Sequence, residues 1–96
     1  MELTPKRKKK VDYEALNSPL SRIPGMDLRT VRVLLNQEIT DPDELRGRSP
    51  ESLFTEGRRQ NAELAEDVLS YLRMAVYYAE SPDPDPALLA PWKWKD

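Results

Sequence analysis

Neither cysteine nor histidine occurs in this sequence. Their absence excludes disulfides, thiolate chemistry, zinc sites of the usual kind and a histidine general base. Carboxylates, lysine, serine and tyrosine remain for catalysis, and no spacing in the chain groups them into an acid–base pair or a metal site. We therefore predict a protein that is not an enzyme and that has no cofactor, no metal and no small-molecule substrate.

Long apolar runs are also missing. No segment approaches the roughly 20 apolar residues of a membrane span, and the N-terminal charges are not followed by the apolar stretch of a secretion signal. The absence of cysteine fits a reducing compartment. The 96 residues are enough for one small domain. The sequence thus predicts a soluble cytoplasmic protein with no membrane partner.

Positive charge is concentrated at the N-terminal end. Residues 1–10 carry five basic groups and one acid, a balance of +4, whereas residues 11–96 carry ten basic groups and sixteen acids, a balance of −6. We interpret residues 1–12 as a disordered basic arm, because they are dense in charge and almost without apolar anchors. The arm either binds the phosphates of a nucleic acid with salt-dependent affinity or only aids solubility. Its candidate contacts are Lys6, Arg7, Lys8, Lys9 and Lys10.

A turn that contains Ile23 and Gly25 leads directly into a predicted helix. The backbone amides of such a hairpin lie at a helix N-terminus and can receive a phosphate. Gly25 would let the backbone approach the phosphate, and Arg29 and Arg32 would add charge. Asp27 stands at the second position of the usual Gly-x-Gly hairpin, where it would repel a phosphate and can itself cap the helix. The turn is therefore either a phosphate-binding hairpin or a corner kept for packing.

The apolar spacing predicts an all-α fold. Asp27 is expected to cap a helix that runs to about Gln37, and short helices are expected to begin at Asp41-Pro42 and at Ser49-Pro50. Residues 57–60 are expected to form a turn. Asn61 is then expected to cap the longest helix, which runs to about Glu80. The three-and-four spacing predicts that the buried faces of the first and last of these helices contain Leu28, Val31, Leu34, Leu35, Leu64, Val68, Leu72, Ala75, Val76 and Ala79. Ile39 is expected to enter the core. Together these elements predict a bundle of about five helices.

The chain is expected to divide into the arm, a helical domain over residues 13–80, and a C-terminal segment over residues 81–96. Alternating proline and aspartate make residues 81–86 a stiff linker. We expect Trp92 and Trp94 to fold back and hold this segment against the longest helix.

Several further arginines could form a second basic patch if their loops converged. We favour ion pairing instead, because glutamates lie close to them in sequence. The arginines are Arg46, Arg48, Arg58 and Arg59, and the glutamates are Glu44, Glu51 and Glu56.

Particular segments also match a known pattern. They are Ile23-Pro24-Gly25, Asp43 to Gly47, Ser49 to Phe54, Val68-Leu69, Arg73 to Ala79 with its Tyr-Tyr pair, and the terminal Trp92-Lys93-Trp94-Lys95-Asp96. In these segments the chain, from Ser21 to Asp96, resembles the small bacterial pathogenicity-locus family of helix-hairpin-helix proteins, some of which are labelled mitomycin-resistance proteins.

The resemblance implies a helix-hairpin-helix, SAM-like fold of the kind used for sequence-independent DNA contact. It implies no enzymatic activity. The chain departs from the family pattern at Asp27, which replaces the second hairpin glycine, and at Glu38, where a Gly-Ile turn normally closes the second helix. Two functions remain open: weak sequence-independent DNA binding through the hairpin and the arm, or a protein-interaction domain whose degenerate hairpin no longer binds DNA.

Overall fold

A computed structural model describes residues 11–95 and confirms an all-α protein: within this range every regular element is helical. The described residues form four α-helices, where about five helices were expected for the domain. They are α1 (Tyr13–Leu16), α2 (Leu28–Leu35), α3 (Pro50–Gln60) and α4 (Asp67–Glu80). Four 3₁₀ turns connect or follow them, namely η1 (Pro19–Arg22), η2 (Pro42–Leu45), η3 (Pro86–Leu88) and η4 (Pro91–Trp94).

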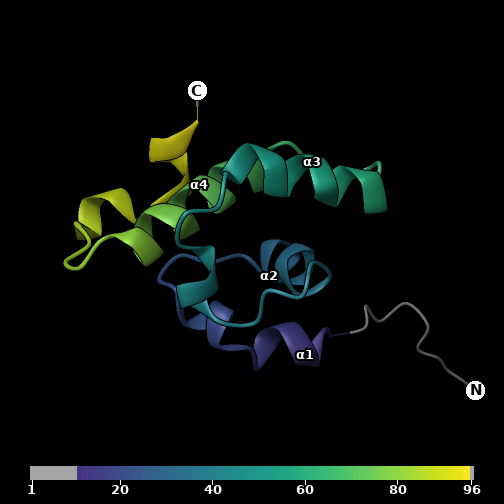
Figure 1. Cartoon of the computed structure of the whole chain (residues 1–96), viewed down its shortest axis with the longest axis horizontal. Helices are drawn as coiled ribbons and strands as arrows, with labels where there is room; N and C mark the ends of the chain where they lie inside the picture. The colour runs from purple at the N-terminus through teal and green to yellow at the C-terminus, as the bar shows by residue number, and fades with distance from the viewer. Residues whose placement is uncertain (1–10, 96) are drawn as a thin grey trace, which may run out of the picture.

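Helix α4 is the centre of the fold, because it contacts α2, α3, η2 and η4. Figure 1 shows α3 beside α4, with α1 and α2 on the opposite side of α4 from η4. One core joins all four helices, and it consists of Ala15, Leu20, Ile23, Val31, Val33, Leu34, Ile39, Leu45, Leu53, Leu64, Val68, Leu72, Met74, Ala75 and Val76. No helix in the described range is both long enough and apolar enough to span a bilayer.

Proline and a short polar cap start several elements as predicted. The Ser49 hydroxyl accepts the Ser52 amide at 3.1 Å, and the Asp41 carboxylate accepts the Asp43 amide at 2.9 Å. Glu44 reaches back as a capping box would, although it accepts the amide of Thr40 rather than that of the cap residue. These bonds satisfy donors that the first helical turn leaves without partners.

Helix α2 begins directly after Asp27, as predicted, but Asp27 does not cap it through its side chain. The Asp27 side chain makes no capping hydrogen bond and accepts from the Arg29 guanidinium instead, at 2.8 Å. The predicted buried face is also shifted, because Leu28 is exposed whereas Thr30 and Val33 are buried. The helix ends at Leu35, before the predicted Gln37.

Glu38 follows α2 with a φ of 65°. This left-handed conformation is one that glycine adopts at little cost and that other residues rarely adopt. Glu38 stands where the pattern of the resembled family has glycine, and its backbone adopts the conformation that glycine favours. Ile39 follows it into the core, as expected.

The boundary between α3 and α4 differs from the prediction. Residues 57–60 belong to α3 rather than to a turn, and α4 begins at Asp67 rather than after Asn61. Gly57 is buried inside α3, and a Cβ there would lie 3.0 Å from side-chain atoms of both Val33 and Leu64. Glycine is therefore present because two neighbours approach the helix closely, rather than because the chain turns.

The segment 61–66 is a loop with a defined conformation. The Asn61 carboxamide accepts the Glu63 amide at 3.1 Å, and Arg58 donates two hydrogen bonds to the Leu64 carbonyl at 3.1 and 2.9 Å. In a continuous helix the Leu64 carbonyl would instead receive the amide four residues later. The side chain of Leu64 enters the core from this loop.

The C-terminal segment folds back through one of its two tryptophans. The Trp94 ring lies 5.3 Å from the Tyr77 ring, its Nε1 donates to the Leu88 carbonyl at 2.8 Å, and its carbonyl accepts from Arg73 at 2.7 Å. Trp92 is 70% exposed, so the prediction that it holds the segment in place is wrong. Trp94 carries that role as predicted.

Candidate functional site

The predicted hairpin residues occupy three different environments. Ile23 is buried in the core. Gly25 has a φ of 78°, and an added Cβ would lie 2.9 Å from the Leu89 carbonyl oxygen, so the C-terminal segment packs against this side of the turn. Arg29 and Arg32 project from α2 and line one small hollow beside residues 57–65. The structure therefore brings the two arginines together and places Gly25 outside the hollow that they line. Residues 6–10, the candidate contacts of the arm, lie outside the described residues.

Arg29 is paired with two aspartates. It donates to Asp27 at 2.8 Å and to Asp67, the first residue of α4, at 3.0 Å. The hydrogen bond that Arg29 donates to Asp67, and then the one that it donates to Asp27, raise the pKa of Arg29. The positive charge predicted for phosphate is already balanced within the fold.

Arg32 is also paired with two acids. It donates to both carboxylate oxygens of Asp12, at 2.8 and 2.7 Å, and to Glu14 at 2.9 Å. The bidentate contact with Asp12 and then the bond to Glu14 raise the pKa of Arg32, while Arg32 lowers the pKa of Asp12 from 3.8 to about 2. Asp12 also accepts the Ala15 amide at 3.1 Å, which caps α1. Asp12 thus belongs to the folded part, although the arm was expected to extend through it.

The Asp12 pairing predicts a specific pH dependence. The pKa of Asp12 is lower in the folded than in the unfolded chain, so its ionised form favours folding above about pH 4, and this contribution is lost as the pH falls from about 4 to about 2. Asp12→Asn removes the titration and retains a side-chain oxygen for the α1 cap. Urea unfolding at pH 6 and pH 2 should show a larger loss of unfolding free energy for the native protein than for Asp12→Asn. Equal losses in the two proteins would contradict this assignment.

The other predicted ion pairs are formed in part. Arg59 pairs with Glu56 at 2.9 Å, as expected, and this hydrogen bond lowers the pKa of Glu56. Arg58 instead holds the Leu64 carbonyl and lies over the Phe54 ring, 4.7 Å from its centroid. Glu51 pairs with Arg73 from α4 rather than with one of the predicted arginines, and Glu44 accepts a backbone amide. Within residues 11–95, no group of three or more acidic side chains is arranged to hold a metal ion.

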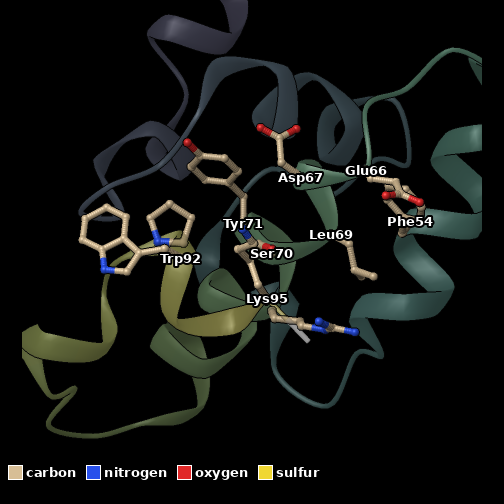
Figure 2. A pocket seen from close by; sticks show the side chains of 10 residues that line it. Phe54, Glu66, Asp67, Leu69, Ser70, Tyr71, Trp92 and Lys95 are labelled. Carbon is tan, nitrogen blue, oxygen red and sulfur yellow. The ribbon is translucent and has the colours of Figure 1, made fainter.

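A larger groove, which the sequence did not indicate, lies between α3, α4 and η4 and has a volume of about 650 Å³. We call it the aromatic groove. In Figure 2, Phe54 and Glu66 lie at one side, Trp92 at the other, and the α4 side chains between them. Its lining residues are Phe54, Glu66, Asp67, Leu69, Ser70, Tyr71, Arg73, Pro91, Trp92 and Lys95. Trp92 was expected to hold the C-terminal segment, and nothing in the spacing of the tail distinguished it from Trp94, which is the tryptophan that packs.

Comparison with known proteins gave no match: no protein-family model, no curated protein and no solved structure matches the chain. The resemblance to the pathogenicity-locus family, together with the function it implies, stays a prediction from sequence.

Proposed function

We propose that the chain is a non-catalytic helix-hairpin-helix module of the bacterial cytoplasm, and that it binds protein rather than DNA. The backbone supports the hairpin assignment: Gly25 and Glu38 both adopt positive φ, at the two turns that flank α2, and Ile23 anchors the first turn in the core. These are the places where a hairpin with glycine turns needs unusual backbone shape.

The pairing of both hairpin arginines with acids carries the proposal. Four carboxylates surround the two guanidinium groups, those of Asp12, Glu14, Asp27 and Asp67. This cluster has a net charge of −2, so an incoming phosphate would meet electrostatic repulsion. The net charge of −6 over residues 11–96 also disfavours the binding of a nucleic acid.

The aromatic groove supports a protein partner. Phe54, Leu69, Tyr71 and Trp92 offer an apolar surface, and a tryptophan that is 70% exposed is typical of the aromatic anchors of protein interfaces. Glu66 and Asp67 at its edge would repel a nucleic acid backbone.

DNA binding is the second candidate, and one observation favours it. Asp27 makes no capping bond, so α2 begins without a side-chain acceptor for its first amides, where a phosphate oxygen could bind. Lys6 to Lys10 would add salt-dependent affinity to such a contact.

An NMR titration of the full chain with a short DNA duplex, at low and moderate salt, separates the two functions. We expect no shifts of the amides from Gly25 to Arg32 at either salt concentration. Shifts in that segment would overturn the proposal. Shifts confined to residues 4–12 that disappear at moderate salt would assign DNA contact to the arm and would also count against a purely protein-binding role.

A variant designed to gain DNA binding tests whether the acids paired with Arg29 are what prevents that binding. Asp27→Gly combined with Asp67→Asn removes both acids from Arg29, so the variant should show salt-dependent shifts from Gly25 to Arg32 when the same duplex is added. The amide spectrum of the variant shows whether it is folded. If it is folded and still shows no shifts, the two acids are not what prevents phosphate binding at the hairpin, and the argument from charge pairing fails.

A further inference from the structure

The C-terminal segment contributes little to the core. None of residues 81–95 is fully buried, and the regular structure of this segment consists of the short 3₁₀ elements η3 and η4. The proline-rich residues 82–86 cannot continue α4, so the chain changes direction directly after Glu80. A segment with few buried apolar contacts can open locally while the rest of a protein stays folded.

A small set of contacts holds the segment on α4. Tyr77 packs against the Trp94 ring, and its hydroxyl accepts the Asp85 amide at 2.8 Å. Arg73 donates to the Trp94 carbonyl at 2.7 Å. Within the segment, Trp94 Nε1 donates to the Leu88 carbonyl at 2.8 Å. The segment is therefore bonded internally, and two α4 side chains attach it to the helix.

The same segment contacts the hairpin and forms part of the aromatic groove. The Leu89 carbonyl oxygen lies 2.9 Å from the position that a Cβ of Gly25 would take. Pro91, Trp92 and Lys95 line the groove, whose other lining residues come from α3, α4 and the residue before α4. Figure 2 shows Trp92 on the ribbon of this segment, beside the α4 side chains. The groove is complete only while the segment lies on α4.

We propose that residues 81–95 form a strap that opens as one unit after Glu80, and that the strap couples the hairpin turn to the aromatic groove. The closed strap completes the groove and packs Leu89 on Gly25. The open strap removes Pro91, Trp92 and Lys95 from the groove and releases the turn. A change at either site shifts the position of the strap, and thereby alters the other site, because both sites share this one element. The inference does not depend on what the groove binds.

Hydrogen exchange of the native full chain tests whether the strap opens as a unit. The Trp94 indole N–H and the amides of Leu88, Leu89 and Lys93 all donate hydrogen bonds within the strap. They should exchange with one common opening free energy, smaller than that of the amides at the centre of α4. If these groups exchanged only through the global unfolding that exposes α4, no separate strap would exist and the inference would fail.

Gly25→Ala tests the coupling from the hairpin side. The added methyl group would press on the Leu89 carbonyl and favour the open strap. Exchange of the Trp94 indole N–H should accelerate roughly tenfold, the effect of a penalty of about 1.4 kcal/mol. Gly47→Ala is the matched control, because Gly47 has the same φ of 78° and no described neighbour near its Cβ position. It should leave the exchange of the Trp94 indole unchanged.

Trp94→Ala tests the coupling in the opposite direction, and it keeps the hairpin sequence intact. It should shift the amide signals of Gly25 and Met26 in NMR, whereas Trp92→Ala should not. Equal indole exchange in the two glycine variants, or hairpin amides that Trp94→Ala leaves in place, would overturn the inference. Those results leave the proposed function standing, since its own test is the DNA titration at the hairpin.

Discussion

Trp94→Ala is expected to lower the free energy of unfolding by about 2–3 kcal/mol, somewhat less than the roughly 3–5 kcal/mol of a fully buried aromatic. The substitution removes the ring contact with Tyr77 and the Nε1 hydrogen bond to the Leu88 carbonyl. The ring contact joins the C-terminal segment to α4, and the hydrogen bond joins two parts of the segment to each other. In a domain of this size the midpoint of thermal unfolding should fall by roughly 10–20 °C.

The matched control is Trp92→Ala, which removes the same side chain from an exposed position two residues away. Its effect on the free energy of unfolding should stay within about 0.5 kcal/mol. Thermal melts of both variants under the same conditions measure the two losses. Equal losses in the two variants would show that the packing of Trp94 does not hold the C-terminal segment.

Gly25→Ala is expected to destabilise the fold by about 2–4 kcal/mol through two separate effects. The φ of 78° is costly for any residue with a Cβ, and that Cβ would lie 2.9 Å from the Leu89 carbonyl oxygen, which belongs to the backbone and cannot rotate away. The turn or the C-terminal segment must therefore move.

Gly47→Ala separates the two effects, because Gly47 has the same φ of 78° but lies in open space. Apart from its chain neighbours, no described residue has an atom within 4 Å of the place that a Cβ would take. The variant should lose only the conformational part, about 1–2 kcal/mol. Urea unfolding of both variants measures the difference, which is the contribution of the contact with Leu89. If Gly25→Ala cost no more than Gly47→Ala, the C-terminal segment would not be packed tightly on the hairpin.

Local chemistry made much of the fold predictable. Ser49-Pro50 and Asp41-Pro42 start their elements as expected, since a cap and a proline act on amides within a few residues. Apolar spacing found Val31 and Leu34 on the buried face of α2, because helical periodicity depends on sequence separation alone.

Gly57 shows why the boundary between α3 and α4 was not predictable. Glycine followed by two arginines and a glutamine is typical of a turn, and only the approach of Val33 and Leu64 explains a glycine inside a helix. Asn61 was a plausible cap for the longest helix, yet Arg58 holds the Leu64 carbonyl and keeps the following residues out of α4. Both causes are side-chain contacts that helical periodicity does not reveal.

For the hairpin arginines, the sequence predicted which residues would carry the charge but not which acids would pair with them. The spacing of Arg29 and Arg32 places them on one face of α2, but Asp67 is 38 residues from the first and Asp12 is 20 residues from the second. The aromatic groove likewise combines α3, α4 and η4.

The sequence by itself determined an all-α chain, the caps at Ser49 and Asp41 and most of the buried positions, because each depends on neighbours within about one helical turn. Only the tertiary structure decided that Asp12 and Asp67 pair with the hairpin arginines and that Trp94 is packed while Trp92 is exposed. Ion pairs and ring packing depend on distances through space, and the folding of distant segments sets those distances.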